Sequence, residues 1–461
     1  MAPCCPVRPA ALCLMAGLMA DPSASAPDPS ASDPGSSQAN ATDWALVVAG
    51  GGPAGYMAAI SAAEAGVRGV LLLESTPEPL GKVLISGGGR CNVTHACWDP
   101  RELVGFYPRG SRALRGPFSR FAAGDAVAWF DEHGLELVEE DDGRLFPRSQ
   151  RSTSVIRTLR QAAERAGVEL RTHTALQRAE ALPGGGFALE LRCGGGAASR
   201  SGQLRCERLV LATGSHPSGR RLAQDLGHGL VPPVPSLFSL TLRPNPLQAL
   251  AGVSQNPVGL ELTIPGVTER FRQEGPLLIT HWGLSGPAAL RLTAFAARAL
   301  HTSGYRAELR IDWSGGRSES ALEALFAACR RDQARRQLGT TRPWPELSRR
   351  LWLHLLEQQG VDAQLRWADW PRRQERAVLA ALRASRYEVA GRGPFGEEFV
   401  TAGGVCLGEV NLASMESRRV SGLYLVGELL DVDGVTGGFN FQHCWTSGWL
   451  AGQAIAAAVV T

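Results

Sequence analysis

The chain has 461 residues, of which 44% are hydrophobic and 20% charged, the balance of an ordinary globular protein with a large core. A formal net charge of +3 is too small to indicate nucleic acid or a membrane surface as a partner. The sequence has no apolar run of the roughly 20 residues that a spanning helix needs, so we expect no integral membrane segment. The ten cysteines include no C-x-x-C pair, so we expect a reducing compartment and no metal.

Residues 1–43 differ from the rest of the chain, because they are rich in Ala, Pro and Ser and contain one arginine and no glutamate. This composition indicates disorder or targeting, and we expect the folded part to begin near Trp44. The apolar stretch after Arg8 resembles a signal peptide, the low acidity before Asp21 is typical of a transit peptide, and an uncleaved tail is the third alternative. We expect a soluble protein of the cytoplasm or of an organelle, with the plastid among the alternatives.

A glycine-rich turn follows the first predicted strand. The apolar residues 45–48 break into glycines, and an alanine-rich helix precedes a second apolar run at residues 70–73. Gly50, Gly52 and Gly55 therefore stand as G-x-G-x-x-G between a strand and a helix, the context that indicates a dinucleotide-binding turn. The first glycine allows the tight turn, the second lets a pyrophosphate approach the backbone, and the third lets the helix pack on the sheet.

Two further features of this unit fit a bound dinucleotide. The N-terminus of the helix offers unpaired N–H groups and a partial positive charge to phosphates. Glu74, at the tip of the second run, is predicted to accept hydrogen bonds from the adenosine ribose hydroxyls. A glycine turn in an α/β domain without a ligand is the alternative, and the strand–turn–helix context disfavours it.

The segment SGGGRCN, residues 86–92, is a second glycine-rich loop. Consecutive glycines adopt left-handed conformations and turn several N–H groups toward one point, so we predict a nest that faces the cofactor. Ser86, Arg90 and Asn92 would add side-chain donors. Cys91 invites a redox role, but it has no partner at C-x-x-C spacing, and we favour a small packed residue.

Lys82 precedes this loop and is the only lysine in the chain, against 46 arginines. Lysine is a compact point charge, whereas arginine is a wide planar fork, so a lone lysine beside a cofactor loop suggests a site where the two are not interchangeable. A contact with the phosphate or ribose region of the dinucleotide is our preferred hypothesis, because Lys82 follows Glu74 closely. A contact with the redox-active ring of the cofactor and an incidental surface lysine are the alternatives.

Two later segments decide between NAD and FAD. Residues 207–217 form a strand that ends in Ala-Thr-Gly, where Thr213 and Gly214 bring the backbone close to a ligand. Residues 422–456 repeat the pattern of strand, Gly-Glu, glycine-rich loop and helix. A nucleotide site assembled from the first and last fifths of a chain is typical of flavoproteins. FAD is therefore the predicted cofactor; the chain has no second strand-borne fingerprint for a dedicated NAD(P)H domain, and NAD(P)H remains an alternative electron donor.

The middle of the chain has a different pattern. From residue 238 to about residue 311, short apolar segments alternate with Pro and Gly turns, which predicts a small antiparallel barrel. Residues 318–386 read as helices with surplus arginine and four interleaved tryptophans, Trp344, Trp352, Trp367 and Trp370. Arginines with aromatic residues can bind RNA, so a flavin-carrying RNA-binding or tRNA-modifying protein is the alternative function. We favour an amphipathic helical cap with the tryptophans in its core, and nucleic acid is not the expected partner.

Four strings, in this order, resemble the YhiN/BaiN-type, aminoacetone-oxidase-like family of FAD-dependent oxidoreductases: SGGGRCN at 86–92, THWGLSGP at 280–287, TAGGV at 401–405 and GELLDVDGVTGGFNFQ at 427–442. The resemblance covers the chain from about Trp44 to the C-terminus. It implies a glutathione-reductase-type FAD domain interrupted by a small β-barrel and a helical insertion. The short path from ATGS to GHGLVPPVPSLFSL lacks a glycine-rich stretch that many members carry, and it resembles a plant and algal-like branch.

The predicted fold is therefore α/β, with a Rossmann-like FAD-binding domain at 44–237 and 391–461, an inserted barrel at 238–317 and a helical insertion at 318–390. We predict an FAD-dependent oxidoreductase that acts on a small organic substrate by hydride transfer at flavin N5, as a reductase or as an oxidase. His281 is the predicted acid or base, because imidazole titrates near neutral pH, and a structural histidine is the equal alternative. Trp282 beside it would stack on a planar ligand or fill core.

The helix after Asn440 is expected to point its N-terminus at the flavin ring and to stabilise negative charge there. The predicted cofactor-binding residues are Gly50, Gly52, Ala54, Gly55, Glu74, Lys82, Ser86, Gly87, Gly88, Gly89, Arg90, Cys91, Asn92, Leu176, Thr213, Gly214, Gly427, Glu428, Gly434, Thr436, Gly437, Gly438, Phe439, Asn440 and Phe441.

Overall fold

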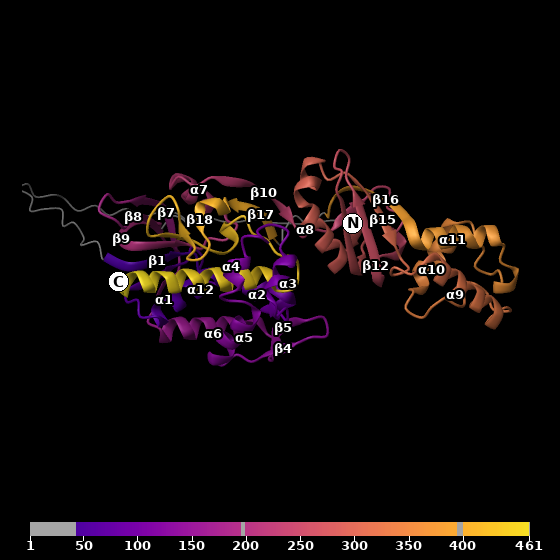
Figure 1. Cartoon of the computed structure of the whole chain (residues 1–461), viewed down its shortest axis with the longest axis horizontal. Helices are drawn as coiled ribbons and strands as arrows, with labels where there is room; N and C mark the ends of the chain where they lie inside the picture. Colours follow the sequence, from indigo (N-terminus) through magenta and orange to yellow (C-terminus); the bar gives the residue numbers. More distant parts are fainter. Residues whose placement is uncertain (1–42, 195–198, 394–399, 461) are drawn as a thin grey trace, which may run out of the picture. The chain divides into compact units, whose positions relative to one another are not determined.

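A parallel sheet forms the centre of the nucleotide-binding half of the chain. The computed structural model describes residues 43–194, 199–393 and 400–460 (Figure 1). The segment predicted to be disordered or targeting, residues 1–43, lies outside the described residues except for its last position. The parallel strands stand in the order β20 (Leu423–Leu425), β9 (Arg200–Leu211), β1 (Asp43–Ala49), β2 (Val70–Leu73) and β6 (Glu169–Arg171). All four residues of β2 are buried, as in parallel strands covered on both faces. The predicted α/β, Rossmann-type fold is confirmed.

Two long helices pack on each other beside this sheet. Helix α1 (Pro53–Glu64) follows β1, and α12 (Phe439–Val460) ends the described chain; Figure 1 shows α12 running along α1. Two glycines of α12 allow this approach, because an added Cβ would lie 2.5 Å from the Ala54 carbonyl oxygen at Gly448 and 2.6 Å from the Ser61 Cβ at Gly452. The first and last helices of the fold are thus held together by close backbone contact.

Smaller elements surround the sheet. Antiparallel strands β7 (Thr174–Ala181) and β8 (Phe187–Cys193) extend it at β9, and the strands β18 (Val410–Asn411) and β19 (Glu416–Ser417) extend it at β20. The remaining elements of this half are α2 (Gly81–Gly89), β3 (Thr94–His95), α3 (Pro100–Leu103), α4 (Arg115–Phe118), α5 (Ala123–Glu132), β4 (Leu137–Glu139), β5 (Arg144–Pro147), α6 (Ser152–Arg165), α7 (Pro217–Asp225), β10 (Leu230–Ser236) and β17 (Val400–Val405).

A closed antiparallel barrel occupies the middle of the chain, as predicted. Its strands stand in the order β11 (Leu240–Leu242), β14 (Gly283–Ser285), β13 (Arg270–Ile279), β12 (Ser254–Thr263), β15 (Ala307–Asp312) and β16 (Ser385–Arg392). Helix α8 (Pro287–Thr302) packs on the barrel, and its buried face joins the barrel's hydrophobic core.

The helical insertion lies between two strands of this barrel. It contains α9 (Glu319–Asp332), α10 (Arg349–Gln358) and α11 (Arg372–Ala384). The four predicted tryptophans are all buried in its core, and Trp352 and Trp367 stack with ring centroids 6.2 Å apart. The expectation of helix up to residue 390 is wrong at its end, because Tyr387 and Val389 are buried on alternate positions of β16, which closes the barrel.

Within these described ranges, no helix is both long and apolar enough to cross a membrane. The described residues belong to one compact unit, so the domain boundaries within it stay predictions.

Candidate functional site

The turn between β1 and α1 needs glycine at two positions for steric reasons. Gly50 has a φ of +118°, and a Cβ added there would lie 2.4 Å from the Ala212 carbonyl oxygen. A Cβ added at Gly55 would lie 1.9 Å from the Gly50 carbonyl oxygen. At Gly52, by contrast, an added Cβ meets no described atom within 4 Å. Gly50 and Gly55 therefore maintain the turn, while Gly52 borders open space where a ligand can approach the backbone.

The N-terminus of α1 faces the same space. Gly52 is its N-cap residue and has no side chain to accept hydrogen bonds from the first N–H groups of the helix. Glu74 is held beside this turn, because one carboxylate oxygen accepts from the Gly51 N–H at 2.9 Å and the other accepts from the Thr76 N–H at 2.7 Å. These features fit a dinucleotide: uncapped N–H groups for phosphates, and a carboxylate at the end of the next strand.

Three segments that are far apart in the sequence meet next to α1. A Cβ added at Gly427 would lie 2.8 Å from the Ala54 Cβ, and one added at Gly214 would lie 3.6 Å from the Glu428 Oε2. Lys82 forms an ion pair with Glu428, and its Nζ lies 3.3 Å from the Ser215 hydroxyl. The Lys82 side chain is 53% exposed and that of Glu428 only 12%. The structure thus joins the lysine to the Ala-Thr-Gly and Gly-Glu segments.

The loop at residues 86–92 has the predicted left-handed backbone. The φ angles of Gly87, Gly88 and Gly89 are 56°, 68° and 82°, and they interrupt α2. A Cβ added at Gly88 or Gly89 would meet no described atom within 4 Å. This succession of glycines leaves room for a ligand beside the backbone.

Two polar side chains of this loop already have partners within the protein. The Ser86 hydroxyl donates to the Val83 carbonyl at 2.9 Å. The Arg90 guanidinium pairs with Glu140 and lies over the Phe146 ring at 4.0 Å. Asn92 is different: it is 9% exposed, and among the described residues its Oδ1 has no hydrogen-bond partner. Asn92 is therefore the side chain of this loop that retains an unused polar atom.

Cys91 is fully buried, and this burial raises the pKa of its thiol to about 12. A thiol with that pKa is protonated at neutral pH, and the thiolate is the reactive form. The structure therefore favours a packed residue over a redox-active one.

The C-terminal glycine-rich loop packs against β3, the strand that follows the loop at residues 86–92. A Cβ added at Gly438 would lie 2.8 Å from the Thr94 backbone. Phe439 stacks on the His95 ring at 4.8 Å, and the Tyr107 hydroxyl donates to the Phe439 carbonyl at 2.6 Å. Asn440 closes the loop on itself, since its side-chain amide exchanges two hydrogen bonds, of 2.9 and 2.8 Å, with the Gly434 backbone.

The remaining predicted residues lie as follows. Phe441 lies in the first turn of α12, partly buried and stacked on Trp445, while Thr436 is exposed in the preceding loop. Leu176 is buried in β7, and the Thr213 hydroxyl oxygen is buried next to Gly219.

His281 is not brought to this cluster by any interaction within the described ranges. It is exposed on the turn between β13 and β14, where its carbonyl accepts from the Asn245 side chain at 3.1 Å. Its role as an acid or base stays a prediction.

Sequence reasoning missed Arg109, which binds the DVDG segment at residues 431–434. Its guanidinium forms a two-pronged ion pair with Asp433, which is fully buried, and donates to the Ala294 carbonyl in α8 at 2.6 Å. The Ser236 hydroxyl donates to the same carboxylate at 2.8 Å. The short acidic motif next to a glycine-rich loop was a signal that a buried cation is required, although no local pattern identifies its partner.

The chain is similar to several known proteins. The family model of the HI0933-like protein Rossmann domain matches residues 44–454. A 3-dehydro-bile acid delta(4,6)-reductase from Clostridium scindens is 30% identical over 423 residues, which cover 89% of this chain and 98% of that protein. A ribosomal RNA dihydrouridine synthase from Escherichia coli is 30% identical over 430 residues, with the same two coverages. The solved structure of a flavocytochrome c3 fumarate reductase has a TM-score of 0.49 and 17% identity, and covers 91% of this chain and 79% of its own.

The structure has a Rossmann-type sheet, an uncapped helix N-terminus behind G-x-G-x-x-G and a glycine-rich loop near the C-terminus, which are features of a dinucleotide-binding site. Together with the family match, they make the chain an FAD-dependent oxidoreductase. The chain belongs to the HI0933-like family, which confirms the predicted YhiN/BaiN-type resemblance.

Proposed function

We propose that this protein is a reductase of a C=C bond conjugated to a carbonyl group. The observation that carries the proposal is the common chemistry in the names of two relatives, each matched over 98% of its length. A 3-dehydro, delta(4,6) compound has its double bonds next to a ketone, and dihydrouridine is uridine whose ring double bond beside a carbonyl has been saturated. Both names describe the addition of hydrogen to an electron-poor C=C bond.

Bound FAD, once reduced by an electron donor, would supply a hydride from its N5 atom, and a proton would supply the second hydrogen of the saturated bond. We assign the pyrophosphate to the N-terminus of α1 at Gly52, where the structure leaves open space, and the ribose hydroxyls to Glu74. Gly88, Gly89 and the unpaired Oδ1 of Asn92 would line the cofactor. The N-terminus of α12, behind Gly438, would favour negative charge on the reduced ring by about 0.3–1 kcal/mol when exposed.

We further propose a reduced nicotinamide nucleotide as the electron donor. Support comes from the reductase named among the relatives, because a reductase needs a donor. The test is anaerobic mixing of the FAD-loaded protein with NADH or NADPH, followed by the flavin absorbance. Rapid bleaching is the expected result. Slow bleaching with fast reoxidation in air would indicate an oxidase and would contradict this assignment.

The substrate is proposed to be a small unsaturated ketone or lactam. The buried tryptophans of the helical insertion support this choice, since they fill its core and are not available for stacking on bases. The test is reoxidation of the reduced protein by a 3-oxo-4-ene bile acid, with a product that has gained two hydrogen atoms by mass spectrometry.

A second candidate is the uracil base of an RNA, favoured by the dihydrouridine synthases among the relatives. Incubation of the reduced protein with ribosomal RNA from cells lacking dihydrouridine tests it. New dihydrouridine without reduction of the bile acid would move the assignment to RNA. Reduction of neither compound would contradict the proposed reaction itself.

A further inference from the structure

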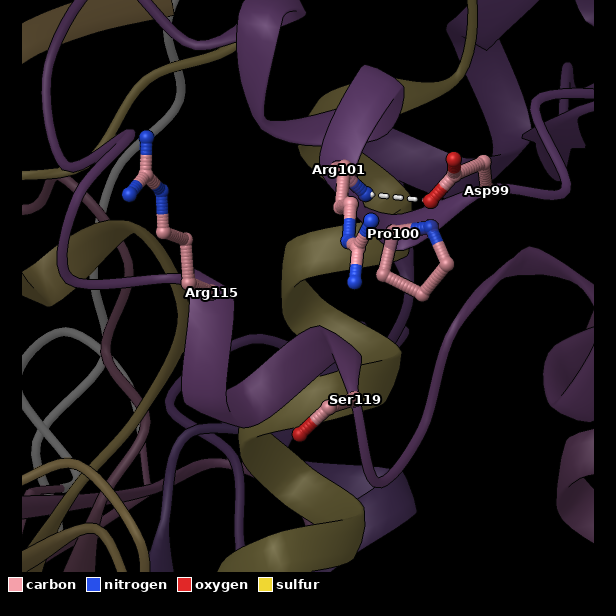
Figure 2. Close-up of a pocket in the computed structure, with 5 residues that line it drawn as sticks. All are labelled: Asp99, Pro100, Arg101, Arg115 and Ser119. Carbon is pink, nitrogen blue, oxygen red and sulfur yellow. Dashed lines mark hydrogen bonds between the residues drawn. The ribbon is translucent and has the colours of Figure 1, made fainter.

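A pocket of about 470 Å³ lies between the short helices α3 and α4. Five residues line it: Asp99, Pro100, Arg101, Arg115 and Ser119. Figure 2 shows Arg115 on the left with its side chain pointing up, Arg101 nearer the centre, and Ser119 below them. None of the five is among the predicted cofactor-binding residues.

The two guanidinium groups are free in the part of the chain that the structure describes. Neither Arg101 nor Arg115 forms an ion pair or a side-chain hydrogen bond there, and both residues are exposed. Asp99 does not neutralise Arg101 through its side chain; its Oδ1 accepts from the Arg101 backbone N–H at 2.8 Å and caps α3 (Figure 2). Two unpaired cations that line one hollow form a local excess of positive charge.

Three lining residues, Asp99, Pro100 and Arg101, belong to the segment 95–107, which contacts Phe439 of the C-terminal glycine-rich loop at both of its ends. On one side, His95 stacks on Phe439; on the other, the Tyr107 hydroxyl donates to the Phe439 carbonyl. Trp98, which precedes Asp99 directly, is 53% exposed, an unusual exposure for so large an apolar side chain. The other two lining residues lie in or next to α4, where the Phe118 ring packs on Tyr107 at 5.2 Å. Tyr107 therefore links both walls of the pocket to the C-terminal glycine-rich loop, where the flavin is assigned.

We infer that Arg101 and Arg115 form a subsite for an oxyanion group of the substrate. Guanidinium groups recognise carboxylates and phosphates by charge and by paired N–H donors. The Ser119 hydroxyl also lines the pocket, but it donates to the Gly116 carbonyl at 2.7 Å, so the two arginines carry the recognition. This inference rests on the proposed function, because it assigns the oxyanion to the substrate that is reduced. The same chemistry serves the carboxylate of a small acid or the phosphodiester of an RNA.

The test is equilibrium binding to the FAD-loaded protein, without turnover. The probes are a 3-oxo-4-ene bile acid, a single-stranded oligouridylate and inorganic phosphate as a competitor. Arg101→Gln and Arg115→Gln should each weaken binding of the substrate-like probe about fivefold, as expected for one partly exposed charge contact. Asp99→Asn keeps the helix cap but removes the negative charge, so it should strengthen binding.

The matched control is Arg157→Gln, since Arg157 is exposed on α6 and also has no partner among the described residues. Weaker binding of the oligouridylate identifies a phosphodiester, provided that the slope of log affinity against log salt concentration also falls by about one. Weaker binding of the bile acid alone identifies a carboxylate. Equal affinities in Arg101→Gln, Arg115→Gln and Arg157→Gln for both probes would overturn the subsite, as would loss of FAD from the pocket variants. Pocket-dependent binding without any reduction would instead overturn the proposed function and leave the subsite standing.

Discussion

Lys82, the only lysine in the chain, forms an ion pair with Glu428, which follows it by 346 residues. The pair joins the segment before the loop at residues 86–92 to the Gly-Glu at the start of the C-terminal motif. The Lys82 Nζ also lies 3.3 Å from the Ser215 hydroxyl, just after the Ala-Thr-Gly that ends a strand. The compact ammonium group thus stands where three parts of the assigned cofactor site meet.

Lys82→Met should weaken FAD binding roughly ten- to a hundredfold, because it removes a charge-assisted contact and leaves Glu428 unpaired. Lys82→Arg keeps the charge but places a wider, planar group at the same point, and we expect a smaller loss. The measurement is FAD dissociation by fluorescence titration. Equal affinity in the wild type and both variants would show that the lysine is an incidental surface cation.

Gly52→Val should fold and lose FAD, whereas Gly55→Val should fail to fold stably. The reason is steric: an added Cβ at Gly52 meets only open space, but at Gly55 it would lie 1.9 Å from the Gly50 carbonyl oxygen. Circular dichroism checks the fold, and flavin absorbance checks the cofactor. A yellow Gly52→Val protein would contradict the assignment of this turn to the pyrophosphate.

Asp433→Asn should destabilise the protein by about 3 kcal/mol, because it removes the buried charge that pairs with Arg109. Asp431→Asn is the matched control, since Asp431 pairs with Arg298 nearer the surface and burial raises the pKa of its carboxyl. Urea unfolding of the two variants gives the comparison. Similar midpoints for both would show that the buried pair contributes no more than a surface pair.

The stability of the protein should fall as pH drops from 6.5 toward 4, in part because of His443. Burial lowers the pKa of this imidazole to about 4, and its Nε2 lies 3.2 Å from the Gly427 carbonyl oxygen. Between these two pH values the unfolded state binds a proton that the folded state does not, so this group alone removes about 3 kcal/mol of unfolding free energy.

His443→Gln keeps an N–H donor for the Gly427 carbonyl and should flatten this pH dependence. His301→Gln, at an exposed position of α8, serves as the control and should leave it unchanged. The measurement is urea unfolding at a series of pH values. An identical slope in the His443→Gln protein would contradict the expected contribution.

The nucleotide-binding turn and its sheet were predictable because their signals are local. The predicted second strand at residues 70–73 is β2 to the residue, and the first is β1 with a few residues added at its ends. Glycine spacing between a strand and a helix reflects contacts within one turn of the chain, and short apolar runs reflect strands buried on both faces.

Long-range partners depend on the tertiary structure. The sequence alone determined the class of cofactor, the barrel and the buried tryptophans of the insertion, because composition and periodicity record what each segment must bury. It did not identify Arg109 as the partner of Asp433 or Glu428 as the partner of Lys82, and it did not place Arg101 and Arg115 around one pocket. It also missed β16, whose short alternating pattern follows a helix without a break. These relationships were decided only by folding, since a charge in a sequence specifies the need for a partner but not which distant segment packs beside it.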